Sequence, residues 1–367
     1  MKKLVAMALS LTLAVSMLTA CGGTKETKAE TSAETTAETG AETTAETGAE
    51  TTAETGGETT AAADGESLKV ALCVTGAVND MGFCQSAYEG LQLLEEKYGA
   101  EIAYTENLQA ADMAAAFTDY AANGYDIVIG HGFQFGDPAL EVGAQYPDTT
   151  FICTEAAAAS DNVASYVMSC EQGGYIEGML AASMTKSNKI GFIGPIEGAS
   201  LIKIMNGFED GAKSINPDIE VQTAWTGSFT DTALAKEAAQ AMIDSGVDFI
   251  AHDANECGNG AIAAAQEAGI YATGDSYDQH ELAPETVLTS SMYNVPLVIE
   301  SAYLDVVNGT FKGEVKYLGM AEGVVEMAPY YDMESVIPED VRTMIDEKIE
   351  AIKSGEFVVP LDENIRN

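Results

Sequence analysis

The turn that precedes the first predicted helix carries polar and aromatic residues suited to contacting a small ligand. Residues 75–91 read TGAVNDMGFCQSAYEGL, a glycine-containing stretch that directly follows a short apolar run. Asn79 and Asp80 either cap the helix, as these residue types commonly do, or face a ligand. Phe83 either joins the core or offers its ring for stacking on a flat ligand. We therefore regard this turn as a candidate binding segment.

The reactive residue types form no recognisable catalytic set. The sequence contains no GxxxxGK[ST], no HExxH and no GxSxG. His131 stands between two glycines after one predicted strand and His252 ends another, so either can border a ligand, while His280 is far from both in sequence. The stretch 130–136, GHGFQFG, has Phe135 where a dinucleotide-binding loop needs its third glycine. We expect a binding protein without metal or cofactor, and not an enzyme.

The elements that position these residues follow an alternating pattern from Leu68 onward. Short apolar runs alternate with longer amphipathic ones, which is typical of βαβ units and parallel sheets. We expect strands at 69–74, 101–106, 125–130, 150–155, 163–168, 189–194 and 269–275, and a further strand from about Val287. We expect helices at 86–99, 110–122, 137–145, 173–185, 295–307 and near 339–353, with two strand-like runs before the last helix.

The folded part predicts two lobes. From Ser67 to the end there are about 300 residues, which is more than a single hydrophobic core usually supports. Two similar α/β blocks also follow one another along this stretch. We assign residues 67–170 with about 290–325 to an N-terminal lobe, and 171–289 with about 326–367 to a C-terminal lobe. Ligands of open α/β sheets bind beyond the carboxyl ends of the strands. We therefore expect the ligand in a cleft between the lobes.

The beginning of the chain predicts export and a lipid anchor. Lys2 and Lys3 precede an apolar run over residues 4–18, the layout of a secretory signal peptide over residues 1–20. The run ends in Leu-Thr-Ala-Cys, which is similar to a bacterial lipobox, so we expect Cys21 to be acylated, for example by palmitate. The protein is then held on the outer face of the cell membrane by lipid alone.

The segment after Cys21 and the overall charge narrow the range of partners. Residues 21–66 are rich in Glu, Thr, Ala and Gly and repeat an eight-residue unit, which predicts a disordered linker. The formal net charge of the chain is −41, and most of the acidic residues lie after the linker. Nucleic acid and anionic membrane surfaces are therefore disfavoured as partners.

The remaining cysteines do not form a disulfide framework. They are odd in number and irregularly spaced: Cys73, Cys84, Cys153, Cys170 and Cys257. Cys73 and Cys153 fall inside apolar runs, where a thiol is usually a small buried hydrophobe.

Five motifs stand in a fixed order along the chain. They are NDxxFxQSAxEGL from Asn79, GYDIVIGHGF from Gly124, YPDTTF from Tyr146, GYIEGMLAASMT from Gly174 and GDSYDQ from Gly274. Over about residues 68–330 they resemble the basic membrane protein family, the substrate-binding lipoproteins of ABC importers that include purine nucleoside receptors. The resemblance implies an α/β, type I periplasmic-binding-protein fold, in which two Rossmann-like lobes close by a hinge over the ligand.

The same resemblance implies roles for individual residues. Phe83 matches an aromatic that stacks on the base, and Glu155 matches an acid that contacts the base edge, although the usual residue is the shorter Asp. Asp275 matches the acid that holds the ribose hydroxyls, and its alternative role is an N-cap of the next segment. We include Phe133 and Asp253, which follow predicted strands, as further candidates for ligand contact.

The chain also departs from the nucleoside-binding pattern. Tyr293, in SSMYN, stands where many members have a lysine, and the first strand ends in Cys73-Val74-Thr75 without the frequent aspartate. Trp225 and Phe229, in AWTGSFTD, match a place where relatives carry an aromatic near the ligand. A tryptophan at a strand end is also a common structural residue, so both roles stay open for Trp225.

These observations together predict a nucleoside-binding lipoprotein, with a purine nucleoside favoured, that delivers its ligand to ABC permease subunits. One alternative is a ligand-binding sensor lipoprotein that signals to a membrane partner. Another is an importer component for a different small polar ligand, and a weaker one is an enzyme that cleaves sugars or nucleosides.

Overall fold

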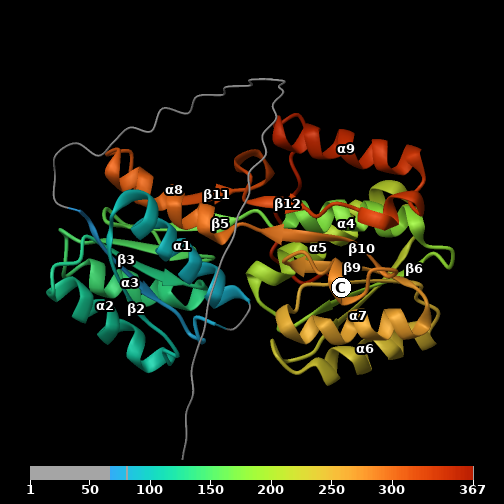
Figure 1. Ribbon diagram of the computed structural model, residues 1–367, viewed down its shortest axis with the longest axis horizontal. Coiled ribbons are helices and arrows are strands. Elements are labelled where there is room, and N and C mark those ends of the chain that lie inside the picture. The colour runs from blue at the N-terminus through green and yellow to red at the C-terminus, as the bar shows by residue number, and fades with distance from the viewer. Residues whose placement is uncertain (1–66, 80–81, 367) are drawn as a thin grey trace, which may run out of the picture. The chain divides into compact units, whose positions relative to one another are not determined.

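The computed structural model describes residues 67–79 and 82–366 (Figure 1). The predicted signal peptide, Cys21, the predicted linker and Asp80 lie outside the described residues. Two six-stranded sheets organise this part of the chain, with the orders β11-β5-β4-β3-β1-β2 and β12-β10-β9-β8-β6-β7. All neighbours are parallel except β12, which pairs antiparallel with β10. We call the parts built on these sheets the first and second lobes.

The strands and helices of the first lobe follow the predicted succession closely. Its strands are β1 (Lys69–Cys73), β2 (Glu101–Thr105), β3 (Ile127–His131), β4 (Thr150–Thr154), β5 (Val163–Met168) and β11 (Val315–Leu318). Its helices are α1 (Phe83–Tyr98), α2 (Met113–Ala122), α3 (Gly136–Gly143) and α8 (Val295–Val307). Gly99 ends α1 in the left-handed conformation, with φ 69°, which glycine adopts readily because it has no Cβ.

The four inner strands of the first sheet, β1, β3, β4 and β5, are buried on both faces, which explains their nearly continuous apolar sequences. Val70 and Leu72 point to the core shared with α1 and α8, while Ala71 and Cys73 point to a second core beneath α2 and α3. This alternation follows from the two-residue period of a strand. The prediction that Cys73 and Cys153 are buried hydrophobes is confirmed, and burial raises the pKa of each thiol to about 12.

The second lobe repeats the arrangement. Its strands are β6 (Lys189–Gly194), β7 (Glu220–Trp225), β8 (Phe249–His252), β9 (Tyr271–Ser276), β10 (Val287–Tyr293) and β12 (Val325–Met327). Its helices are α4 (Glu171–Met184), α5 (Ala199–Ile215), α6 (Thr232–Asp244), α7 (Asn259–Ala268) and α9 (Glu339–Lys353). Helices α4 and α5 approach unusually closely: a Cβ on Gly178 would lie 1.9 Å from the Phe208 carbonyl oxygen, and one on Gly211 equally close to that of Tyr175. The two helices therefore pack as one rigid layer.

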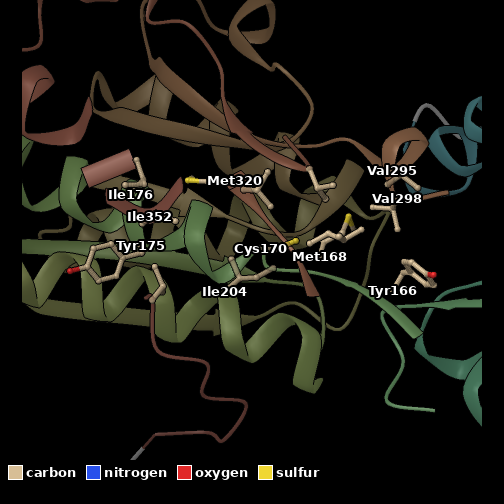
Figure 2. Packing of buried hydrophobic residues seen from close by; sticks show 14 of the residues in the cluster. Tyr166, Met168, Cys170, Tyr175, Ile176, Ile204, Val295, Val298, Met320 and Ile352 are labelled. Atoms are coloured by element: carbon tan, nitrogen blue, oxygen red, sulfur yellow. The ribbon is translucent and has the colours of Figure 1, made fainter. Parts of the chain in front are cut away.

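The chain crosses between the lobes three times. The crossings join β5 to α4, β10 to α8 and β11 to β12. One apolar core runs through this region, and Figure 2 shows part of it, with Met168 and Cys170 between Tyr166 of β5 and the side chains of α4. The first crossing, at Ser169 and Cys170, is thus embedded in packed side chains.

Candidate functional site

The candidate residues gather where the strands of both sheets end. In the first lobe, Phe83 begins α1 after the turn that follows β1, and Glu155 directly follows β4. In the second lobe, Asp253 directly follows β8, and Asp275 and Tyr293 lie at the carboxyl ends of β9 and β10. The carboxyl ends of parallel strands are where open α/β sheets bind ligands.

Phe83 is fixed by a histidine beneath it. Its half-buried ring stacks on the ring of His131, with centroids 3.6 Å apart and an angle of 28° between the planes. His131 Nε2 lies 3.0 Å from the Phe83 carbonyl oxygen, and Nδ1 lies 2.8 Å from Thr154 Oγ1, which in turn accepts a hydrogen bond from the Gly132 amide. His131 is itself buried, so its ring supports one face of the phenyl ring.

Glu155 is engaged with the first crossing between the lobes. Its Oε1 accepts a 2.6 Å hydrogen bond from the Met168 amide, and its Oε2 lies 3.4 Å from the Nζ of Lys203. The residue adopts the left-handed backbone conformation, with φ 54°. A non-glycine residue in this region stores strain, and such residues cluster at functional sites.

Lys203 is a buried cation that the sequence did not single out. It lies on α5 of the second lobe, its side chain is 1% exposed, and its Nζ donates a 2.6 Å hydrogen bond to the Met168 carbonyl oxygen. Glu171 Oε2 lies 4.0 Å from the same nitrogen. Burial alone would lower the pKa of Lys203, but the charges of Glu155, Cys170 and Glu171 outweigh it and raise the pKa above its usual value. The lysine therefore stays charged and ties α5 to the end of β5.

Asp253 and Asp275 form a buried acidic pair in the second lobe. Their side chains are 7% and 2% exposed, and neither Asp253 Oδ2 nor Asp275 Oδ1 accepts a hydrogen bond from a donor in the described part of the chain. Burial and then the charge of Asp275 raise the pKa of Asp253 well above its usual range. Burial also raises the pKa of Asp275, to about 6, against hydrogen bonds from Asp253, Ser276 and Tyr293. Of the two acids, Asp253 therefore keeps its proton to the higher pH.

Two further ionisable side chains, Glu177 and Tyr293, act on this pair, and neither is a cation. Glu177, on α4, is buried, and burial followed by the charge of Asp275 raises its pKa well above its usual value. Burial followed by the charge of Asp275 likewise raises the pKa of Tyr293, so its hydroxyl remains a neutral donor. The region of Asp275 thus holds several acids and offers acceptor atoms to a ligand that donates hydrogen bonds.

Gln279 organises the end of β9. Its Oε1 accepts a 2.9 Å hydrogen bond from the Asp275 amide and lies 3.0 Å from His252 Nε2, and its Nε2 donates to Asn259. Burial lowers the pKa of His252 to about 4, against the effect of Gln279, so His252 is neutral near pH 7. The predicted N-cap alternative for Asp275 is wrong, because Asp275 lies within β9 and Gln279 is the N-cap of the short helix at His280–Leu282.

The remaining candidates lie toward the surface. Phe133 is 53% exposed and Phe229 is 41% exposed. Trp225 is half-buried, and its ring lies across Gly194, where a Cβ would come within 2.2 Å of the indole. Asn79 is exposed, and it does not cap α1, because the N-cap is Gly82.

A metal site and a membrane-spanning helix are both absent from the part of the chain that the structure covers. Over residues 67–79 and 82–366, no group of three His, Cys, Asp or Glu side chains is arranged to hold a metal ion. In the same residues, no helix is both long enough and apolar enough to cross a membrane.

The two parallel α/β lobes, joined by three crossings, define a protein of the type I periplasmic-binding-protein fold. A solute-binding protein of an ABC transporter from Aeropyrum pernix K1 superposes with a TM-score of 0.70 at 24% identity, over 80% of this chain and 94% of that one. The family model for ABC transporter substrate-binding proteins of the PnrA-like type matches residues 67–363, and the chain belongs to this family. Proteins of this class bind substrates outside the cytoplasm for ABC transporters and are not enzymes.

Two curated relatives carry different names. A purine-binding protein of Brucella abortus (strain 2308) is 33% identical over 294 residues, which is 79% of this chain and 82% of that protein. The transcriptional activator protein med of Bacillus subtilis (strain 168) is 33% identical over 263 residues, 71% of this chain and 82% of that protein.

Proposed function

We propose that this protein captures a nucleoside, preferably a purine nucleoside, by closing its two lobes around it, and passes it to ABC permease subunits. The observation that carries this proposal is the buried pair Asp253 and Asp275, which keeps acceptor oxygens at the strand ends of the second lobe. The two vicinal hydroxyls of a ribose can each donate a hydrogen bond to an oxygen of this pair. Hydrogen bonds to a carboxylate are stronger than those between neutral groups. The relative named as purine-binding supports the same ligand class.

The base is proposed to stack on Phe83. Because His131 supports one face of the ring at a centroid distance of 3.6 Å, the ring needs little ordering when a ligand stacks on its other face. Glu155 has two acceptor positions in use, and a carboxylate has about four, so it can still accept a hydrogen bond from the base edge.

The ligand is proposed to be uncharged at its sugar end. Tyr293 supplies a neutral hydroxyl beside Asp275, and Glu177 adds a further buried acid. A phosphate group placed here would lie against the carboxylate of Asp275, which costs Coulomb energy at short range. We therefore propose a nucleoside rather than a nucleotide. We propose Asn79, Asp80, Phe133, Trp225 and Phe229 as contacts at the rim of the site.

The placement at the membrane and the lobe boundaries also belong to this proposal. Residues 1–20 are proposed to direct export, Cys21 to carry the lipid, and residues 21–66 to space the folded part from the membrane. The lobes are proposed to divide near residue 170, near 290 and near 325, where the chain passes between the sheets.

A nucleoside panel combined with two variants tests the ligand assignment. Guanosine, adenosine, inosine, uridine, free bases, sugars and amino acids are compared by thermal shift and calorimetry, because a ligand that binds only the native state raises the melting temperature. Phe83→Ala and Asp275→Ala are each expected to raise the dissociation constant about ten- to hundredfold. Gln92→Ala, at an exposed position of α1 outside the proposed site, serves as the control for handling and expression.

Two results would count against the assignment. If no nucleoside shifts the melting temperature, while a sugar or an amino acid does, the ligand class is wrong. If Phe83→Ala is destabilised without ligand but binds guanosine as tightly as the parent, Phe83 is a core residue and not a wall of the site, since removing a core phenylalanine costs about 3–5 kcal/mol.

A sensor is the second candidate function, because a relative at 33% identity is named a transcriptional activator. Uptake of labelled guanosine and the transcript profile are compared between the parent strain and a strain lacking this protein. Loss of uptake supports the importer, whereas changed transcription with unchanged uptake supports the sensor.

A further inference from the structure

A side chain of the second lobe reaches the start of the first helix of the first lobe. The hydroxyl of Tyr277, directly after β9, donates a 2.9 Å hydrogen bond to the carbonyl oxygen of Gly82. The same oxygen accepts the first intrahelical bond of α1 from the Ser86 amide at 3.0 Å, so both of its lone pairs are used. Gly82 immediately precedes Phe83, which places this contact one residue from the proposed aromatic wall.

A second segment of the same lobe lies against Gly82. A Cβ on Gly82 would come within 2.6 Å of Asn255 Oδ1 and 3.2 Å of Asn255 Cγ. Asn255 follows β8, so two neighbouring strand ends of the second lobe meet at the same glycine. The absence of a side chain at Gly82 is what permits this approach.

The backbone at both contact segments is held in an uncommon conformation. Asn255 has φ 49° and Ser276, beside Tyr277, has φ 66°. Left-handed backbone is costly for residues other than glycine and persists where the surrounding structure requires it, commonly at functional sites. Together with Glu155, which directly follows β4, these left-handed non-glycine residues lie at or within three residues of the ends of β4, β8 and β9.

Consecutive carbonyl groups at the start of α1 are thus held from opposite lobes. The Gly82 carbonyl accepts from Tyr277 of the second lobe, and the Phe83 carbonyl contacts His131 of the first lobe. A movement of the second lobe away from the first breaks the Tyr277 bond without disturbing the His131 contact. The bond therefore forms only when the strand ends of the two lobes are together.

We propose that Tyr277 is a positioning residue that holds the second lobe closed on the aromatic wall, by bonding the carbonyl directly before Phe83. This inference rests on the proposed binding by lobe closure. The bond adds to the stability of the closed form alone, so Tyr277 slows the escape of a bound ligand and leaves its entry unchanged.

A cysteine pair across the contact measures closure without any ligand. Gly82→Cys with Asn255→Cys places two thiols at positions close enough for a disulfide, and the rate of oxidative cross-linking reports how often the lobes meet. The five cysteines of the described region are all buried, and peptide mapping separates the new link from them. We expect Tyr277→Phe to slow cross-linking about three- to tenfold, the range for one hydrogen bond. Tyr104→Phe, at an exposed tyrosine of the first lobe, is the matched control and leaves the rate unchanged.

Guanosine provides the ligand arm of the same experiment. With the native Gly82 and Asn255, Tyr277→Phe is expected to raise the dissociation rate of guanosine about three- to tenfold, with the association rate and the ligand-free melting temperature near those of the parent. Cross-linking that does not occur, or that is equally fast in Tyr277→Phe, overturns the role of Tyr277. Cross-linking that depends on Tyr277 but is unaffected by any nucleoside keeps this role and overturns the nucleoside proposal instead.

Discussion

Replacing Lys203 by methionine tests whether the buried cation holds the crossing between the lobes. Methionine keeps the length and apolar stem of the side chain but removes the charge. In the parent protein Nζ donates to the Met168 carbonyl oxygen at 2.6 Å and lies 3.4 Å from Glu155 Oε2. The variant leaves Glu155 and Glu171 buried without their cation, and leaves one carbonyl without its donor.

The expected loss follows from the burial of the pair. Removing one partner of a buried ion pair costs about 3–5 kcal/mol, because the other charge remains desolvated. Unfolding entropy of about 2.1 cal/mol/K per residue gives about 0.6 kcal/mol/K for a folded part of about 300 residues, so the melting temperature should fall about 5–8 °C. Lys203 lowers the pKa of Glu171 against the effect of burial. Without the lysine that pKa rises further, so the loss of stability should grow as the pH increases.

Thermal and urea unfolding of two lysine variants on one helix provide the measurement. Lys213→Met removes an exposed cation of α5 that pairs with Glu209 four residues earlier, and such pairs contribute at most about 0.5 kcal/mol. Lys203→Met combined with Glu155→Gln should recover part of the lost stability, since the double variant buries one uncompensated charge fewer than Lys203→Met alone. Equal melting temperatures for Lys203→Met and Lys213→Met at pH 7 would refute the argument that the buried cation holds the crossing.

Three other predictions concern the site and the anchor. Asp275→Asn should stabilise the ligand-free protein at pH 7 by up to about 3 kcal/mol. The pKa of Asp275 is about 6 in the folded protein and 3.8 in the unfolded chain, so the acid favours the folded state only at low pH. This contribution is lost as the pH rises from 3.8 through 6, and the asparagine variant does not lose it. Urea unfolding at pH 4 and pH 7 checks this, and a variant no more stable than the parent at pH 7 contradicts it. Cys21→Ser should release the protein from the membrane fraction, and undiminished anchoring on fractionation argues against lipidation. Deleting residues 30–62 should change the guanosine affinity less than about twofold by calorimetry, since a flexible polar spacer adds no packing, whereas a tenfold loss would place the repeat in the site.

Local patterns were sufficient to predict most of the fold. The run at 163–168 forms β5 with the predicted bounds, because an apolar stretch of β-branched and aromatic residues between turn residues has few other structures available. The helix predicted at 86–99 begins three residues earlier, at Phe83. Its start was missed because Gly82 is the N-cap and the helix opens without the usual polar cap residue.

The site was predicted less completely, because its key contacts join residues far apart in sequence. Lys203 lies in an ordinary amphipathic helix, and only its pairing with Glu155, 48 residues away in the other lobe, distinguishes it. His131 was a candidate for ligand contact, and its stacking on Phe83 and its contact with Thr154 could not be read from the sequence. Tyr277 belongs to the quoted GDSYDQ motif, yet its partner Gly82 is 195 residues away. Such pairings depend on tertiary packing, which local propensity does not encode.

The position of Trp225 gives this protein a built-in optical reporter. It is the single tryptophan of the chain, it ends β7, and its indole lies half-buried across Gly194. Indole emission shifts with the polarity around the ring, so the fluorescence of the native chain comes from one known place in the second lobe. A titration that changes this emission reports an event at the strand ends of that lobe without any dye or added label.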